Sequence, residues 1–144
     1  MSLTKEIIDR DEVFCFAPVG GSMYPFIRSR DVIHIKPAHR ASLRYGDIIL
    51  FCDEKGGLLA HRIIKKRKTG DRSAFFVKGD ALAGDDGYIE REAIIGKVVA
   101  IEKGKRLIDL DGGLFKLANI LYTLTLPVSR WAYVLFERCA KKIY

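Results

Sequence analysis

The chain has 144 residues, which is enough for one compact domain and too few for two ordinary ones. Apolar residues make up 49% of it and charged residues 30%, so it can bury a core and does not have the composition of a disordered protein. Lys and Arg outnumber Asp and Glu by 25 to 18. The resulting net charge of +7 favours an acidic partner without identifying one.

Cysteine usage and hydropathy bear on the location of the protein. The three cysteines are scattered, which argues against a disulfide framework and favours a reducing compartment: Cys15, Cys52 and Cys139. The first ten residues carry charges where a signal peptide needs an apolar run, so neither a secretory segment nor an N-terminal membrane anchor is expected. The longest uncharged apolar stretch, residues 117–129, would reach about 20 Å as a helix, short of the roughly 30 Å hydrocarbon core. We therefore expect a cytoplasmic protein, with peripheral membrane association as the alternative.

Short β-like runs, broken by Gly, Asp and Pro, occupy the chain up to residue 111. The expected strands are residues 32–36, 47–52, 58–64, 74–78, 94–102 and 106–110. Because no long helix separates them, a parallel sheet with crossover helices is excluded. The pattern predicts an antiparallel, mostly β domain over residues 1–111.

A C-terminal helical segment, residues 112–144, is expected to follow this domain. Its apolar residues recur at helical spacing, and the stripe consists of Leu114, Leu117, Leu121 and Leu124. Pro127 interrupts or kinks the run, and a second segment near residues 129–141 carries Trp131 among basic residues. The stripe is expected to bind a surface, which is either the sheet of its own domain or a membrane interface.

The most distinctive string in the sequence is Gly-Gly-Ser-Met-Tyr-Pro-Phe, residues 20–26. The two glycines permit a backbone path that is closed to other residues, and Pro25 fixes φ just after it. Ser22 is therefore expected on a sharp, exposed turn, where its backbone N–H is a candidate oxyanion donor for acyl transfer. An isolated Gly-Ser pair is usually an ordinary turn, but the extended string is less generic.

A serine nucleophile needs a base, and the candidates are His34, His39 and His61. His61 lies in the expected strand 58–64, where alternation puts it on one face with Leu59 and Ile63. Imidazole suits a general base near neutral pH, although a histidine on an apolar face is more often a core residue.

An acidic loop, residues 77–86, supplies the third group. It contains Asp80, Asp85 and Asp86, whose spacing does not match a calcium-binding EF-hand. A solvated turn is the ordinary explanation, but a carboxylate here can also orient His61 and stabilise its protonated form.

These pieces, in this order, resemble the signal peptidase I superfamily, which includes the self-cleaving repressor domains. Residues 21–25 look like the nucleophile box, residues 44–51 the following Gly-Asp strand, and residues 78–86 the acidic box; residues 95–99 are similar to its closing strand. Ala-His-Arg-Ile-Ile, residues 60–64, resembles the branch in which histidine replaces a lysine base. The resemblance implies a signal-peptidase-like β fold.

The same resemblance assigns roles to residues. It implies Ser22 as nucleophile, His61 as base and Asp86 as the orienting aspartate, with Asp80 as the competitor for that role. Family signal peptidases carry an N-terminal anchor and repressors a DNA-binding domain, and neither is expected here. The resemblance therefore supports the chemistry better than it supports export processing.

Two functions of different classes are expected. The first is a serine endopeptidase that cleaves an extended or signal-peptide-like substrate, and the second is a non-catalytic module of the same fold that binds a peptide or a membrane surface. No cofactor or metal is expected, because Cys52 and His61 lack zinc spacing and no phosphate-binding glycine loop is present. The basic run 62–68 is expected to be a solvated strand end rather than a nucleic-acid surface, because no aromatic residue interleaves it.

Overall fold

Runs of β-branched and aromatic residues between Gly, Asp and Pro turns form strands in residues 12–125, the part of the chain that the computed structural model describes. The strands are β1 (Phe14–Phe16), β2 (Val32–Pro37), β3 (Ile48–Cys52), β4 (Leu58–Thr69), β5 (Arg72–Lys78), β6 (Gly87–Glu90), β7 (Ile94–Lys103) and β8 (Arg106–Asp109). Two short 3-10 helices, η1 (Ala38–Arg40) and η2 (Arg91–Ala93), precede strands or loops, and residues 113–125 are helical.

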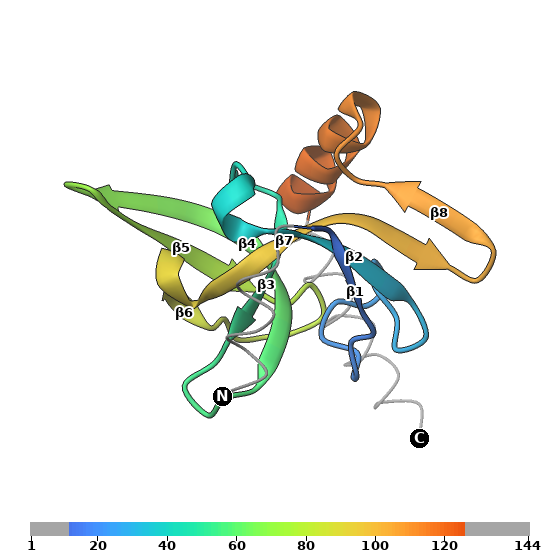
Figure 1. Ribbon diagram of the computed structural model, residues 1–144, viewed down its shortest axis with the longest axis horizontal. Coiled ribbons are helices and arrows are strands. Elements are labelled where there is room, and N and C mark those ends of the chain that lie inside the picture. The colour runs from blue at the N-terminus through green and yellow to red at the C-terminus, as the bar shows by residue number, and fades with distance from the viewer. Residues whose placement is uncertain (1–11, 126–144) are drawn as a thin grey trace, which may run out of the picture.

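All eight strands belong to one sheet, in the order β1-β2-β7-β3-β4-β5-β6, with β8 also paired to β7. Every pairing is antiparallel, which confirms the predicted mostly β antiparallel domain with a C-terminal helix. Figure 1 shows the β4–β5 hairpin reaching to one side of the molecule and the β7–β8 hairpin to the other. β1 and β6 were not expected from the sequence.

The sheet is buried on both faces near its centre. Along β3, Ile48 and Leu50 enter one core cluster while Ile49 and Phe51 enter a second on the opposite face. This two-sided burial explains why β3 is a continuous apolar run rather than an alternating one. β4 has the same property at its first half, where Ala60 faces the first cluster and Ile63 the second.

The C-terminal helix meets the domain through its polar face. Asn119 and Thr123 are buried, whereas the four leucines of the predicted stripe are 54–81% exposed. Of the two surfaces expected for the stripe, the sheet of its own domain is therefore not the one that it contacts. The second expected segment and Trp131 lie outside the described residues. Between residues 12 and 125, no helix is long and apolar enough to span a membrane.

Candidate active site

Ser22 lies on a turn whose neighbouring residues pack into the core. Gly20 has φ of +102°, a conformation that favours glycine, and opens the turn. Met23 and Ile27 are buried in the first core cluster and joined by a 2.9 Å backbone hydrogen bond, while Ser22 stays half-buried. The carbonyl oxygen of Ser22 accepts a 2.8 Å hydrogen bond from the N–H of Ala81, which ties the turn to the acidic loop.

His61 is held in β4 with only 2% of its side chain exposed. Its Nδ1 lies 2.5 Å from Oδ2 of Asp86, and its ring meets the ring of Phe51 edge-on with centroids 5.9 Å apart. The carboxylate of Asp86 can only accept, so Nδ1 carries a proton, and in the neutral imidazole Nε2 presents a lone pair. A hydrogen bond of 3.1 Å from the N–H of Asp86 to the carbonyl of Val77 fixes the loop.

The second ring nitrogen of His61 is the unusual atom of the site. Nε2 is buried, and no described residue forms a hydrogen bond with it. A buried polar atom without a partner costs about 1–3 kcal/mol, and such atoms are rare in folded proteins. A nitrogen oriented by a carboxylate on one side and left with a free lone pair on the other is the arrangement that a general base requires.

A small pocket joins the Ser22 turn to β4. It has a volume of about 30 Å³ and is lined by Pro18, Val19, Gly20, Ser22, Met23, Ile27, Leu58, Leu59 and Ala60. Three consecutive residues of β4 line it, so it follows the edge of the strand rather than either face.

That edge of β4 has no strand partner among the described residues. On one side β4 pairs with β3 from Leu58 to Arg62, but on the other its pairing with β5 begins only at Arg62. Ala81, whose N–H binds the carbonyl of Ser22, lies three residues after the end of β5, which places the Ser22 turn at this free edge. On this side, the main chain of residues 58–61 therefore pairs with no described strand.

Ser22 and His61 do not form a hydrogen bond in this structure. His61 lies on the face of β4 that carries Ile63, whereas Met23 and Ile27 pack against the other face. Neither cluster includes Ser22. Contact between Ser22 and His61, by a small rotation of either side chain, stays a prediction.

Asp80, the competitor for the orienting role, contacts a different residue. Its carboxylate is fully buried and accepts hydrogen bonds of 2.8 and 2.7 Å from Nε and Nη2 of Arg62. The expectation that Arg62 begins a solvated basic run is therefore wrong, since its side chain is 0% exposed; only residues 65–69 of β4 are exposed. An arginine between apolar neighbours in a strand is the signal that predicts a buried cation in need of a carboxylate.

The other histidines lie elsewhere or serve other contacts. His34 is on β2, where its Nε2 is 3.4 Å from Glu102.

Aromatic rings also accompany the exposed basic residues of β4, because Arg67 lies over the ring of Tyr88 at 4.3 Å. The sequence did not reveal this neighbour, because the ring comes from β6 rather than from the basic run.

Within residues 12–125, no three His, Cys, Asp or Glu side chains group as ligands for a metal ion.

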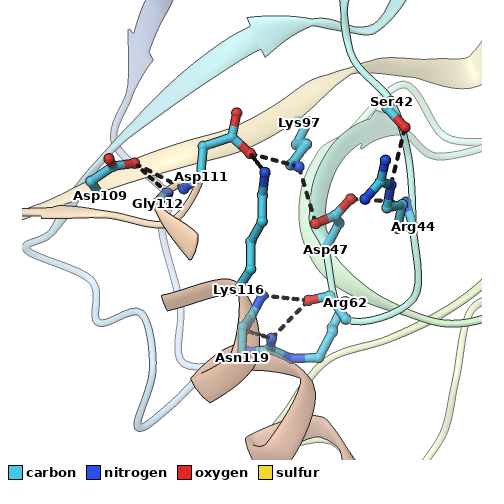
Figure 2. Close-up of polar contacts among 11 residues, drawn as sticks. Ser42, Arg44, Asp47, Arg62, Lys97, Asp109, Asp111, Gly112, Lys116 and Asn119 are labelled. Atoms are coloured by element: carbon cyan, nitrogen blue, oxygen red, sulfur yellow. Dashed lines mark hydrogen bonds and ion pairs between the residues drawn. The ribbon is translucent and has the colours of Figure 1, made fainter. Parts of the chain in front are cut away.

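A second buried cation, Lys97 of β7, was also missed. Its Nζ lies 3.1 Å from Asp47 and 3.0 Å from Asp111, and Lys116 of the helix reaches Asp111 at 3.5 Å. Figure 2 shows Lys97 between the two carboxylates and Lys116 approaching from the helix. Because two carboxylates contact it, Lys97 is placed as a structural cation and not as a base for Ser22.

Comparisons with known proteins add no identification. No family model matches the chain, and no curated protein matches it.

Proposed function

We propose that the protein is a serine endopeptidase in which Ser22 is the nucleophile, His61 the general base and Asp86 the orienting carboxylate. The observation that supports this most is the His61 ring, with Nδ1 held by Asp86 at 2.5 Å and a buried Nε2 that has no hydrogen-bond partner among residues 12–125. The proposal includes a signal-peptidase-like fold, on the strength of the sequence motifs. Neither a metal nor a cofactor takes part in it.

The chemistry follows from these positions. Oγ of Ser22 attacks the carbonyl carbon of the scissile peptide bond as its proton passes to Nε2 of His61. Asp86 stabilises the imidazolium that forms, and the backbone N–H of Ser22 is the candidate donor to the developing oxyanion. Nε2 then gives its proton to the leaving amine, and a water molecule repeats the sequence to release the acyl group from Ser22.

The substrate is proposed to be an extended peptide with a small apolar side chain near the cut. The free edge of β4 at residues 58–61 can pair with a peptide main chain, which favours an extended conformation. The pocket beside Ser22 has about 30 Å³ and most of the residues that line it are apolar, which favours a small side chain.

Peptide libraries test the proposal directly. Peptides incubated with the wild-type chain and with Ser22→Ala are compared by mass spectrometry, together with labelling by a fluorophosphonate. Cleavage products and a labelled Ser22 in the wild type only are the expected result. If both proteins give the same products and neither is labelled, the peptidase proposal is wrong.

The alternative is a module that binds a peptide or a membrane surface without catalysis. It is favoured by the exposed leucine stripe of the C-terminal helix, which the domain leaves uncovered. A cytoplasmic location with peripheral attachment to a membrane fits either function. Peptide binding by a chain whose Ser22 stays unlabelled supports this alternative over the enzyme.

A further inference from the structure

We infer that Asn119 of the C-terminal helix is a positioning residue: through Arg62 and Asp80 it holds the turn that carries Ser22. This inference rests on the proposed peptidase function. It concerns a helix that the sequence motifs of the candidate site do not include.

Arg62 is the centre of the connection because it follows His61 directly in β4 and is completely buried. A buried guanidinium needs partners for its N–H groups, since an unpaired charge in the interior is costly. The carboxylate of Asp80 accepts hydrogen bonds from Nε and Nη2. Nη1 donates to the carbonyl of Gly46 at 3.0 Å and to Oδ1 of Asn119, so the helix supplies one of the four contacts.

Both the oxygen and the nitrogen of the Asn119 side-chain amide form hydrogen bonds. Its Nδ2 donates a 2.8 Å hydrogen bond to the same carbonyl of Gly46 that Arg62 contacts. Figure 2 shows Asn119 and Arg62 converging beside the helix. Gly46 has φ of +86°, a conformation that favours glycine, and it lies against the helix, since a Cβ there would be in ordinary contact with Oγ1 of Thr123 at 3.4 Å.

From Arg62 the connection reaches Ser22 by two routes. The first passes through Asp80, whose neighbour Ala81 donates to the carbonyl of Ser22 at 2.8 Å. Gly79 lies so close to that carbonyl that an added Cβ would be 2.8 Å from its oxygen. The loop that Arg62 fixes is therefore in tight contact with the nucleophile turn.

The second route is a stack of side chains. The ring of Phe26, four residues after Ser22, lies 4.7 Å from the Arg62 guanidinium. The ring of Tyr122 lies 5.1 Å from the same guanidinium and 5.5 Å from the ring of Phe26. The helix thus contacts the nucleophile segment directly as well as through Arg62.

Asn119 is singled out because the helix buries little else. Its leucines face away from the domain, and the buried helix residues are Asn119 and Thr123. The docking of the helix therefore depends on these polar contacts and on the stacking of Tyr122 rather than on the leucine stripe. Loss of the Asn119 amide leaves Nη1 of Arg62 and the carbonyl of Gly46 one partner short, and the network loosens at Asp80 and Ala81.

Three variants in the full chain test this role. Asn119→Leu keeps the branched shape of the side chain and removes both hydrogen bonds, Asn119→Asp keeps an acceptor for Arg62, and Leu121→Ala is the matched control on the exposed side of the helix. Amide hydrogen exchange is measured by NMR at Ala81 and at the core residue Ile49. Exchange at Ala81 is expected to accelerate about tenfold or more in Asn119→Leu, while Ile49 and the control stay unchanged and Asn119→Asp recovers part of the protection.

Peptide cleavage gives the second readout. In Asn119→Leu, kcat is expected to fall about tenfold or more with KM nearly unchanged, because the reacting groups are misplaced while the peptide edge of β4 remains. Unchanged exchange at Ala81 in Asn119→Leu overturns the inference. A wild type that cleaves no peptide overturns the peptidase proposal instead, and faster exchange at Ala81 still supports the connection from Asn119 to the Ser22 turn.

Discussion

At the scale of single residues, the environments of two aspartates separate their roles. Asp86 is 23% exposed and contacts the base candidate, whereas Asp80 is fully buried and neutralises a fully buried arginine. A carboxylate at the edge of the site can be altered without leaving a charge unpaired in the interior. Altering the carboxylate that pairs with Arg62 instead leaves a buried guanidinium without its counter-charge.

Asp86→Asn is predicted to leave the fold intact and to lower turnover. The amide cannot stabilise the imidazolium of His61, and its NH₂ group favours the wrong ring tautomer. We expect kcat to fall by roughly 10²–10⁴-fold with a melting temperature close to that of the wild type. Steady-state kinetics on one peptide, together with thermal unfolding, measure the two effects.

The control for this prediction is Asp80→Asn, which leaves the Arg62 guanidinium without its carboxylate. Breaking a buried ion pair costs about 3–5 kcal/mol, so this variant is expected to melt well below the wild type. A folded, inactive Asp80→Asn beside a fully active Asp86→Asn would reverse the two assignments. Full activity in both would leave Ser22 and His61 as a dyad.

Only part of this site was accessible from the sequence. Ser22, His61 and Asp86 lie in compact motifs, so their residue types and order were enough to propose them. Arg62 and Asn119 are 57 residues apart in the chain, and strand alternation says which side a residue faces but not what covers that side. The free edge of β4 depends on where pairing with β5 begins, which no local pattern encodes.

At the scale of elements, hydrophobic periodicity identified the strands that contribute fully buried apolar residues to the core. It missed β1 and β6, which have three and four residues, too few to show a period. It also ended β4 too early, since the strand continues to Thr69 with polar side chains. That extension is held by backbone pairing with β5 across the Gly70 turn rather than by burial.

For the helix, the spacing of the leucines was recognised but not the face that is buried. The buried Arg62 requires a polar partner, and this tertiary requirement turns the Asn119 side of the helix inward. The apolar side is then exposed, where it is available to a surface.

The exposed stripe predicts binding of the full chain to anionic phospholipid vesicles. Leu117→Gln combined with Leu121→Gln removes apolar area without touching Asn119, and we expect vesicle affinity to fall about tenfold or more. Co-sedimentation measures it, and Leu107→Gln on β8, also exposed, is the control. Equal partitioning of the wild type and the double variant would exclude the stripe as a membrane contact.

At the scale of the whole molecule, buried and half-buried ion pairs connect segments that are distant in sequence. Lys103 of β7 lies 2.7 Å from Asp31, which precedes β2, and Lys97 of β7 connects Asp47 before β3 to Asp111 before the helix. Each pair joins the central strand β7 to a neighbouring segment. The assembly of the sheet and the segments that precede β2, β3 and the helix therefore depends on carboxylates that stay ionised.

This dependence predicts how stability changes with pH. Burial alone would raise the pKa of Asp111, but the hydrogen bond and charge of Lys97, together with Lys116, outweigh it and hold the pKa below its ordinary value. The pKa of Asp31 is lowered in the same way, with burial opposed by Lys103 and Arg28. In the unfolded chain an aspartate titrates near pH about 3.9. The folded state thus binds fewer protons, and its stability is full above that pH and falls as the pH drops further.

Asp111→Asn is therefore predicted to melt below the wild type at pH 7 and to lose less stability on acidification. The difference between the two should shrink as the pH falls from about 4 towards 2, because the wild-type carboxylate is then protonated and no longer pairs with Lys97 and Lys116. The variant still loses stability through Asp31. Thermal unfolding from pH 7 to pH 2 measures both curves, with Asp71→Asn, in an exposed turn, as a control that should follow the wild type. Parallel curves for the wild type and Asp111→Asn would show that the pairing between β7 and the helix does not contribute to stability.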